Sequence, residues 1–255
     1  MLAAERRARI LDELRGTRVV STEELARSLS VSGETIRRDL TGLEQQGLLA
    51  RVHGGAALAQ SRPAGEEASF AERAASEGEA KDRIGRAAAA LVKPGQLIVI
   101  DVGTTAARVA RALPMDLTAT VATCSLLAAI ELAERPNLEV LVCGGRLRGG
   151  DLALSNTIAH AFFADLNPDI AFLGSGGVDA RAGFTDFHLD EALVRKTIVA
   201  NAAASYVLAD ATKFGRVARY RVAGWPSVTG LITDQEPPAS ISTAITGAGG
   251  RILVG

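Results

Sequence analysis

Cysteine is scarce in this 255-residue chain, and Cys124 and Cys143 have neither CxxC spacing nor a companion histidine cluster. This pattern argues against a disulfide framework and against a structural zinc site, so we expect no metal and a reducing, cytoplasmic location. No stretch reaches the roughly 18 uncharged apolar residues of a membrane helix, and no signal-peptide core follows the N-terminal arginines. The sequence therefore predicts neither secretion nor membrane insertion.

An excess of charge of either sign is also missing, because 28 basic and 29 acidic residues leave a net charge of −1. Any affinity for nucleic acid must therefore come from a local arrangement of charges. Apolar residues make up 47% of the chain, which is enough to bury a substantial core. This composition excludes disorder as the main state.

The chain changes character twice along its length. From Ala4 to about Arg51 the pattern is helical and polar, whereas from Gln96 onward short Val/Ile/Leu runs alternate with Ala-rich helical stretches. Residues 59–78 contain Pro, Gly, Ser and several glutamates without a sustained apolar stripe, which is typical of a linker. We therefore predict an N-terminal domain over 1–58, a linker over 59–78 and a larger domain over 79–255.

The first domain is predicted to contain a helix-turn-helix. Apolar residues at helical spacing indicate a helix over 4–15, and Gly16 ends it. Ser21 opens a Ser-Thr-Glu-Glu capping box that begins a short second helix. After a brief turn, Ser32 can cap a third helix that runs to about Gln46.

The third helix has two unlike faces. At about 100° per residue, Leu40 and Leu43 fall within about 40° of Ile36, whereas polar residues fall on the far side. The first turns therefore expose hydroxyl and guanidinium groups, as in a recognition helix that meets base edges and phosphates. Asp39 lies nearer the protein side, where we expect it to pair with an arginine.

Two short apolar runs flank Gly54-Gly55 and predict a small β-hairpin, a wing, after the third helix. Period two places Arg51 and His53 on one face, away from Val52, within reach of the DNA backbone beside the groove. The residues predicted to contact double-stranded DNA are Ser21, Ser32, Thr35, Arg37, Arg38, Thr41, Arg51 and His53. The alternative is a helical interaction module whose arginines are only solvated.

At this point the chain resembles the DeoR-type winged helix-turn-helix family, over nearly all of residues 4–58. The residues that carry this resemblance are Arg6, Ile10, Leu14, Ser32, Thr35-Ile36-Arg37-Arg38-Asp39-Leu40, Glu44, Gly47-Leu48-Leu49 and Arg51-Val52-His53-Gly54-Gly55-Ala56. The resemblance implies sequence-specific binding to operator DNA.

The second domain is predicted to be α/β, with a Rossmann-like, mainly parallel sheet. Buried apolar runs alternate with helical stretches, which implies crossover connections between parallel strands. The predicted strands are 97–100, 119–122, 138–142, 170–173 and 206–208. In such a sheet, ligands bind at the carboxyl ends of the strands.

Glycine and polar residues follow all five predicted strands. After the first, Asp101-Val102-Gly103-Thr104-Thr105 offers a glycine, hydroxyl groups and the free amides of the next helix to an anion such as phosphate. We expect the five strand ends to converge on one crevice. The predicted effector-binding residues are Asp101, Gly103, Thr104, Thr105, Thr123, Ser125, Gly144, Gly145, Gly174, Gly176, Glu191, Asp210 and Lys213.

The run Asp-Val-Gly-Thr-Thr also occurs in sugar kinases of the actin-like fold, but the chain beyond Asp101 is too short for two large lobes. Residues 79–255 instead resemble the DeoR sensor domain, which is similar to ribose-phosphate isomerase. The residues that carry this resemblance are Lys81, Ile84, Asp101, Gly103-Thr104-Thr105, Cys143-Gly144-Gly145, Asp169, Ala171-Phe172, Gly174, Gly183, Thr185, Glu191, Ala209-Asp210 and Lys213-Phe214-Gly215. The resemblance implies binding of a phosphorylated sugar or related metabolite without turnover, and we expect no cofactor.

Together the two halves predict a transcription regulator, a repressor of a carbohydrate-use operon that a phosphorylated sugar releases from DNA. Half-sites about one helical turn apart would require a dimer or a higher even oligomer, assembled through the second domain. Activation remains an open alternative to repression, since no sequence feature fixes the sign of the coupling. An enzyme alternative is a sugar-phosphate isomerase with an appended DNA-binding domain, in which Asp210, Glu191 and Lys213 supply acid–base groups; in the regulator we assign no catalytic residue.

Overall fold

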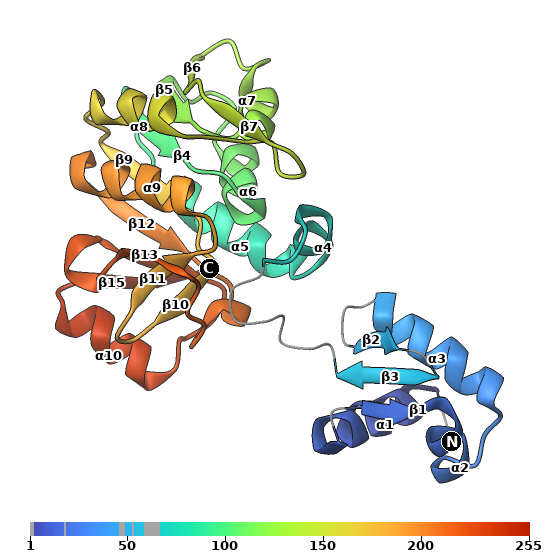
Figure 1. The fold of residues 1–255 in the computed structure, drawn as a ribbon. Coiled ribbons are helices and arrows are strands. Elements are labelled where there is room, and N and C mark those ends of the chain that lie inside the picture. The colour runs from blue at the N-terminus through green and yellow to red at the C-terminus, as the bar shows by residue number, and fades with distance from the viewer. Residues whose placement is uncertain (1–2, 18, 46–48, 53, 59–66) are drawn as a thin grey trace. The chain divides into compact units, whose positions relative to one another are not determined.

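The computed structural model describes residues 3–17, 19–45, 49–52, 54–58 and 67–255, which form two compact units, Met1–Ala64 and Gly65–Gly255 (Figure 1). Each unit has its own buried core. Within the described ranges, no helix combines the length and the apolar content that crossing a membrane requires.

The N-terminal unit packs three helices against a small antiparallel sheet (Figure 1). Its elements are α1 (Ala3–Thr17), β1 (Val19–Ser21), α2 (Thr22–Ser28), α3 (Gly33–Gln45), β2 (Leu49–Val52) and β3 (Gly55–Leu58). The sheet order is β1-β3-β2, and β3 pairs antiparallel with both neighbours. The predicted helix-turn-helix with a wing is thus confirmed.

Local sequence signals explain where these elements begin. The Ser21 hydroxyl accepts the Glu24 amide at 3.1 Å while the Glu24 carboxylate accepts the Ser21 amide, which completes the predicted capping box of α2. The Thr35 amide donates to the Ser32 hydroxyl at 3.2 Å at the start of α3. Gly55 leaves room for β1, because a Cβ there would lie 2.0 Å from the Val20 carbonyl oxygen.

Asp39 ties α3 to α1 from the protein side, as predicted. Its carboxylate is buried and accepts the Nε groups of both Arg6 and Arg7, the latter at 3.1 Å. Beside it, Ile36, Leu40 and Leu43 are fully buried in the core of this unit. The buried face of α3 is therefore fixed by apolar packing and by the two ion pairs of Asp39.

We predict that Asp39→Ala lowers the stability of the N-terminal unit by about 2 kcal/mol, because it removes charge-assisted hydrogen bonds to part-buried guanidinium groups. Glu34→Ala is the matched control on the same helix, since its carboxylate is exposed and should matter by less than about 0.5 kcal/mol. Thermal unfolding of the full chain compares the two variants. Equal stability would contradict this role of Asp39.

The C-terminal unit is built on a parallel sheet of seven strands, in the order β15-β14-β12-β9-β4-β5-β6. Its strands are β4 (Leu97–Ile100), β5 (Ala119–Thr123), β6 (Leu138–Val142), β9 (Ile170–Leu173), β12 (Ser205–Leu208), β14 (Gly230–Thr233) and β15 (Arg251–Val254). Every pairing in this sheet is parallel. The predicted α/β fold class is confirmed.

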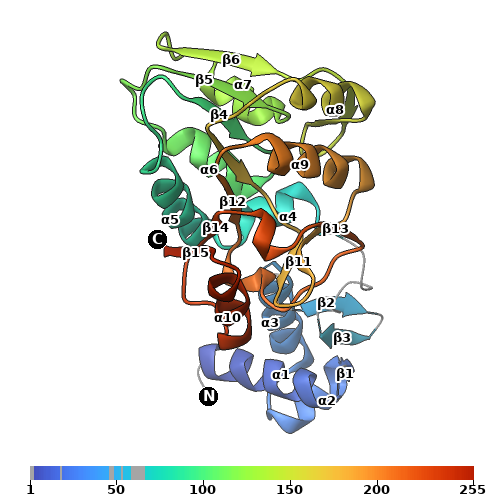
Figure 2. The same cartoon turned by 90° about the vertical axis from the view of Figure 1, so that its left-hand side faces the viewer.

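Helices cover both faces of this sheet (Figures 1 and 2). One core cluster includes residues of α5 (Gly78–Ala89), α6 (Thr104–Ala112) and α7 (Leu126–Leu132). A second cluster includes residues of α8 (Thr157–Ala164), α9 (Leu189–Asn201) and α10 (Ala239–Gly247). From β4 the chain proceeds to β5 and β6 on one side and returns through β9 to the other, so the strand order reverses between β4 and β9. Ligands of open α/β sheets bind at such a switch point.

The structure adds elements that the sequence pattern does not predict. The hairpin of β7 (Arg146–Arg148) and β8 (Ala153–Ser155), and a sheet of β10 (Gly177–Asp179), β11 (Gly183–Asp186) and β13 (Tyr220–Ala223), accompany the main sheet.

Within the predicted linker 59–78, residues 70–75 form the helix α4 (Phe70–Ala75), and α5 begins at Gly78. A capping box between Ser69 and Glu72 starts α4, a local signal that outweighs the polar composition. Residues 59–66 lie outside the described residues.

Candidate functional site

The outer face of α3 is exposed and rich in cationic and hydroxyl groups. The side chains of Arg37 and Arg38 are 60% and 82% exposed, and both lie near Glu34, at 3.3 and 3.7 Å. Exposed pairs of this kind contribute little to stability, so both guanidinium groups are free to exchange Glu34 for another anion. Thr41 is exposed as well, on the same side of the helix.

The other predicted DNA-contacting residues differ in how available they are. Ser32 and Thr35 lie together at the start of α3, with their hydroxyl groups 2.8 Å apart. Arg51 is exposed on β2. The Ser21 hydroxyl is already engaged with Glu24, to which it donates at 2.9 Å, so it acts as a helix cap in this structure. His53 lies outside the described residues.

Arg7 is a residue of this face that sequence reasoning missed. Its guanidinium group extends from Asp39 to Gly42, where an added Cβ would lie 3.1 Å from Nη2. A shallow surface depression joins Arg7 to Arg37, Arg38 and the intervening part of α3. The sequence pattern did not indicate this role of Arg7, because Arg7 and its partner Asp39 are 32 residues apart in the sequence.

The C-terminal unit holds a pocket, the strand-end pocket, at the carboxyl ends of β4, β9 and β12. Its cavity volume is about 50 Å³, room for only a few water molecules. Its lining residues are Glu67, Arg73, Ser76, Lys81, Val102, Gly103, Thr104, Thr105, Ala106, Arg148, Asp151, Gly174, Ser175, Asp186, Glu191, Arg195, Leu208, Asp210, Thr212 and Lys213.

The structure brings part of the predicted effector set together in this pocket. The predicted residues that line it are Gly103, Thr104, Thr105, Gly174, Glu191, Asp210 and Lys213. Asp101 lies directly behind the lining, hydrogen-bonded to the amide of Gly174. The predicted residues that do not line it are Thr123, Ser125, Gly144, Gly145 and Gly176.

The β7–β8 hairpin covers the end of β5, and the predicted residues after β5 and β6 lie outside the pocket lining. The Leu154 amide donates to the Cys124 carbonyl at 2.8 Å, and the Leu126 amide donates to the Leu152 carbonyl at 3.1 Å. Ser125 pairs with Ala153 through an isolated bridge, and its hydroxyl caps α7. Gly176 instead bonds to β11, where a Cβ would collide with the Phe187 ring.

A buried ion pair between Asp101 and Arg195 forms the floor of the pocket. Arg195 donates from Nε to Asp101 at 2.5 Å and also contacts Asp186 and, at 3.5 Å, Glu191. Asp101 and Arg195 are only 1% and 3% exposed. Burial opposes the charge of Arg195, but the surrounding carboxylates raise its pKa well above the ordinary value, so the guanidinium group stays charged.

Burial shifts two further groups beside this pair. It is the main cause that raises the pKa of Glu191 to about 7, against the opposing charge of Arg195. It also raises the pKa of the Cys124 thiol, together with the charge of Asp101, so the thiol stays protonated and unreactive.

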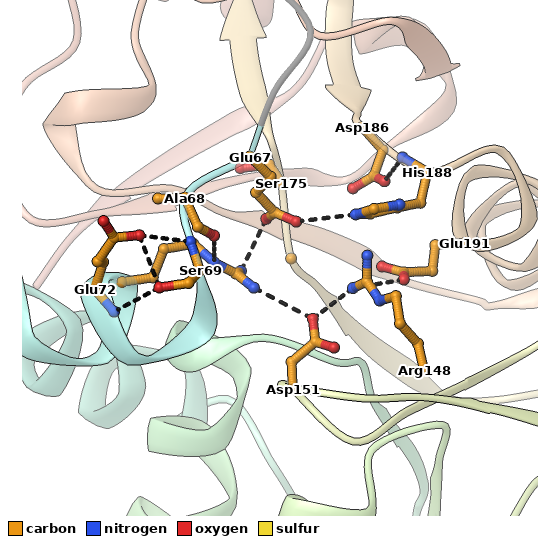
Figure 3. A network of polar contacts seen from close by, with 12 residues as sticks. Glu67, Ala68, Ser69, Glu72, Arg148, Asp151, Ser175, Asp186, His188 and Glu191 are labelled. Atoms are coloured by element: carbon orange, nitrogen blue, oxygen red, sulfur yellow. Dashed lines mark hydrogen bonds and ion pairs between the residues drawn. The ribbon is translucent and has the colours of Figure 1, made fainter. Parts of the chain in front are cut away.

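Between the pocket and an adjoining outer groove lies a set of ion pairs that we call the polar gate, formed by Glu67, Arg73, Arg148 and Asp151. Figure 3 labels Glu67, Arg148 and Asp151 of this set. Arg73 joins Glu67 at 2.8 Å to Asp151 at 3.2 Å, and Arg148 contacts the same Asp151 carboxylate. Arg148 Nε and Asp151 Oδ1 are buried without a hydrogen-bond partner among the described residues. These atoms remain available to a ligand that carries hydroxyl or anionic groups.

One wall of the pocket can receive an anion. Gly103 precedes α6 with a φ of 124°, and no side chain caps the first amides of that helix. The Lys213 ammonium group, in the lining of the same pocket, makes no hydrogen bond or ion pair with any residue the structure describes, and burial lowers its pKa. Free helix amides and a part-buried cation together suit a phosphate group.

Comparison with known proteins places both units in one family. The DeoR-like helix-turn-helix domain matches residues 6–62, and the DeoR C terminal sensor domain matches residues 76–235. This chain belongs to the DeoR family of transcriptional regulators. It is 36% identical to the HTH-type transcriptional regulator GlpR of Haloferax volcanii over 100% of this chain and 99% of the relative. It is 32% identical to the glycerol-3-phosphate regulon repressor of Escherichia coli (strain K12), over 96% of each chain.

Among solved structures, the C-terminal unit of this DeoR-family chain is similar to ribose 5-phosphate isomerase A from Methanocaldococcus jannaschii. The match has a TM-score of 0.42 and 21% identity, and it covers 55% of this chain and 56% of the isomerase.

The pocket residues that sequence reasoning missed are mostly charged. They include Arg195, which lies on the same face of α9 as the predicted Glu191. The i,i+4 spacing of these two residues could have indicated their ion pair from the sequence. Arg73 and Asp151 are 78 residues apart in sequence and had none.

We predict that Asp101→Ala lowers the stability of the C-terminal unit by about 3–5 kcal/mol, because it leaves the buried Arg195 guanidinium group partly uncompensated. Asp116→Ala, which removes an exposed carboxylate of the same unit, is the matched control and should change little. Urea unfolding of the full chain measures both. Equal losses in the two variants would contradict a structural role for the Asp101–Arg195 pair.

Proposed function

We propose that this DeoR-family protein is a sequence-specific DNA-binding repressor of a carbohydrate-use operon, relieved by a phosphorylated sugar. The observation that carries the proposal is that one chain contains both an exposed cationic face on α3 and a pocket in which the uncapped start of α6 at Gly103 and the cation of Lys213 suit a phosphate group. The name of one relative, a glycerol-3-phosphate regulon repressor, supports the same class of effector and of target.

On DNA, the first turns of α3 enter the major groove. Arg37 and Arg38 present guanidinium forks to guanine edges or phosphates, and Ser32 and Thr35 present hydroxyl groups. Arg51 on the wing contacts the adjoining backbone. One helix of this size buries too little surface for tight specific binding, so two chains bind half-sites one turn apart as a dimer or a higher even oligomer, assembled through the C-terminal units.

In the strand-end pocket, the effector's phosphate accepts hydrogen bonds from the first amides of α6 and pairs with Lys213. Its hydroxyl groups donate to carboxylates such as Asp151. The effector binds and leaves unchanged. Glu191, with its pKa near 7, is the observation that favours the isomerase alternative, but Arg148 at 2.7 Å and Arg195 at 3.5 Å hold both its oxygens in ion pairs.

We predict that Arg38→Ala weakens operator binding by about 10- to 100-fold at about 150 mM salt, because it removes a base-edge or phosphate contact without disturbing the core. The operator is first located by protection mapping on the DNA that flanks the protein's own gene. Arg86→Ala is the control, since it removes an exposed arginine of α5 in the other unit. Unchanged operator affinity in Arg38→Ala would remove α3 from the interface.

We predict that Lys213→Ala binds operator as tightly as the unmodified protein but needs about 10- to 100-fold more sugar phosphate for release, because a charge-assisted contact is lost. Lys196→Ala, a change at an exposed lysine of α9, should respond normally. Operator release is measured across a panel of sugar phosphates.

The same proteins test the enzyme alternative. The regulator proposal expects no isomerisation of any sugar phosphate in the panel. Measurable turnover that Lys213→Ala abolishes and Lys196→Ala leaves unchanged would establish the isomerase instead.

A further inference from the structure

A continuous chain of ion pairs connects the pocket floor to the segment beside the joining residues 59–66. In order, the pairs link Arg195, Glu191, Arg148, Asp151, Arg73 and Glu67. Glu67 is the outermost member and the first described residue after 59–66. Its carboxylate also contacts His188 Nε2 at 3.3 Å, so it is held from two sides (Figure 3).

The polar gate separates the strand-end pocket from an outer groove. All four gate residues line both hollows, and the outer groove is further bordered by Phe70 and Phe187. The gate residues themselves line the pocket cavity of about 50 Å³, so their displacement would enlarge the space open to a phosphorylated sugar.

Glu67 differs from the other carboxylates of the pocket lining in its place along the chain. Cationic and carboxylate side chains line the pocket in equal numbers, five of each. Four of the carboxylates, those of Asp151, Asp186, Glu191 and Asp210, belong to the main body of the unit, whereas Glu67 precedes α4. The departure of Glu67 therefore makes the lining more positive by one charge, which favours an entering dianion.

Glu67 is charged whenever the effector is. Burial acts against its ionisation, but the hydrogen bond from His188 and the charge of Arg73 lower its pKa to about 2. The helix that follows Glu67 is also anchored at its far end. The Lys81 ammonium group donates to the carbonyl oxygens of Arg73 and, at 2.6 Å, of Ser76, which ties the far end of α4 to α5. Glu67 can leave while that end stays fixed.

We propose that the Glu67 carboxylate is a built-in competitor of the effector's phosphate monoester, and that an entering phosphate takes over the gate cations and releases residues 67–72, ahead of the end of α4 that Lys81 holds. This inference rests on the proposed function of the pocket as a phosphate site. This segment directly follows residues 59–66, which join it to the DNA-binding unit. Its release is therefore the first step by which effector binding affects that unit. Glu67 thereby also sets the effector concentration at which the response begins.

The first test is the affinity of the full chain for inorganic phosphate, measured by calorimetry. Glu67→Gln keeps the shape of the side chain and removes its charge, so phosphate should bind about tenfold more tightly. Glu79→Gln is the matched control, since that side chain is 90% exposed, and should leave the affinity unchanged. Equal or weaker binding in Glu67→Gln would overturn the competitor role.

The second test is amide hydrogen exchange of the full chain with and without phosphate. Protection of the first amides of α6, together with faster exchange in 67–72, is expected. Protection of α6 with unchanged exchange in 67–72 would overturn the gate and leave the proposed phosphate site standing. No protection of α6 would instead overturn the phosphate site itself, so the two failures are distinguishable.

Discussion

The buried pair of Asp101 and Arg195 is the interaction on which the C-terminal unit depends. Asp101 stands at the end of β4 and accepts the amide of Gly174 at the end of β9, so it joins the two strands between which the sheet order reverses. Arg195 extends this contact to Asp186 and Glu191. Because both charges are buried, each needs the other to offset the free-energy cost of its burial. The pair therefore holds the floor of the pocket in place.

From that floor outward, charge is the common feature of both functional surfaces. The pocket balances its cations with its own carboxylates, and the exposed face of α3 holds Arg37 and Arg38 beside Glu34. In the proposed function, an acidic side chain in both places occupies a position that a phosphate oxygen takes. Binding of an external anion is then an exchange of partners, which limits affinity but lets ligand binding alter the protein's internal contacts.

Periodicity and local motifs predicted the elements that short-range physics decides. The buried face of α3, the cap at Ser32, and the strands β4, β6 and β9 follow from the spacing of apolar and hydroxyl residues. The ends of β5 and β6 were expected in the crevice, but the residues after them do not line it, and the β7–β8 hairpin covers the end of β5 through backbone hydrogen bonds that composition does not encode. The gate had no sequence signal either, because pairs such as Arg73 and Asp151 form only after the sheet has folded.

The central claim is that a sugar phosphate in one unit and DNA on the other bind at the expense of each other. Linkage makes this reciprocal: the factor by which the effector weakens operator binding must equal the factor by which operator weakens effector binding, about 5- to 150-fold. The most direct measurement is the affinity of the full chain for its releasing sugar phosphate with and without saturating operator DNA. The account predicts weaker binding to the DNA-bound protein by that same factor, and equal affinity in the two states would contradict it.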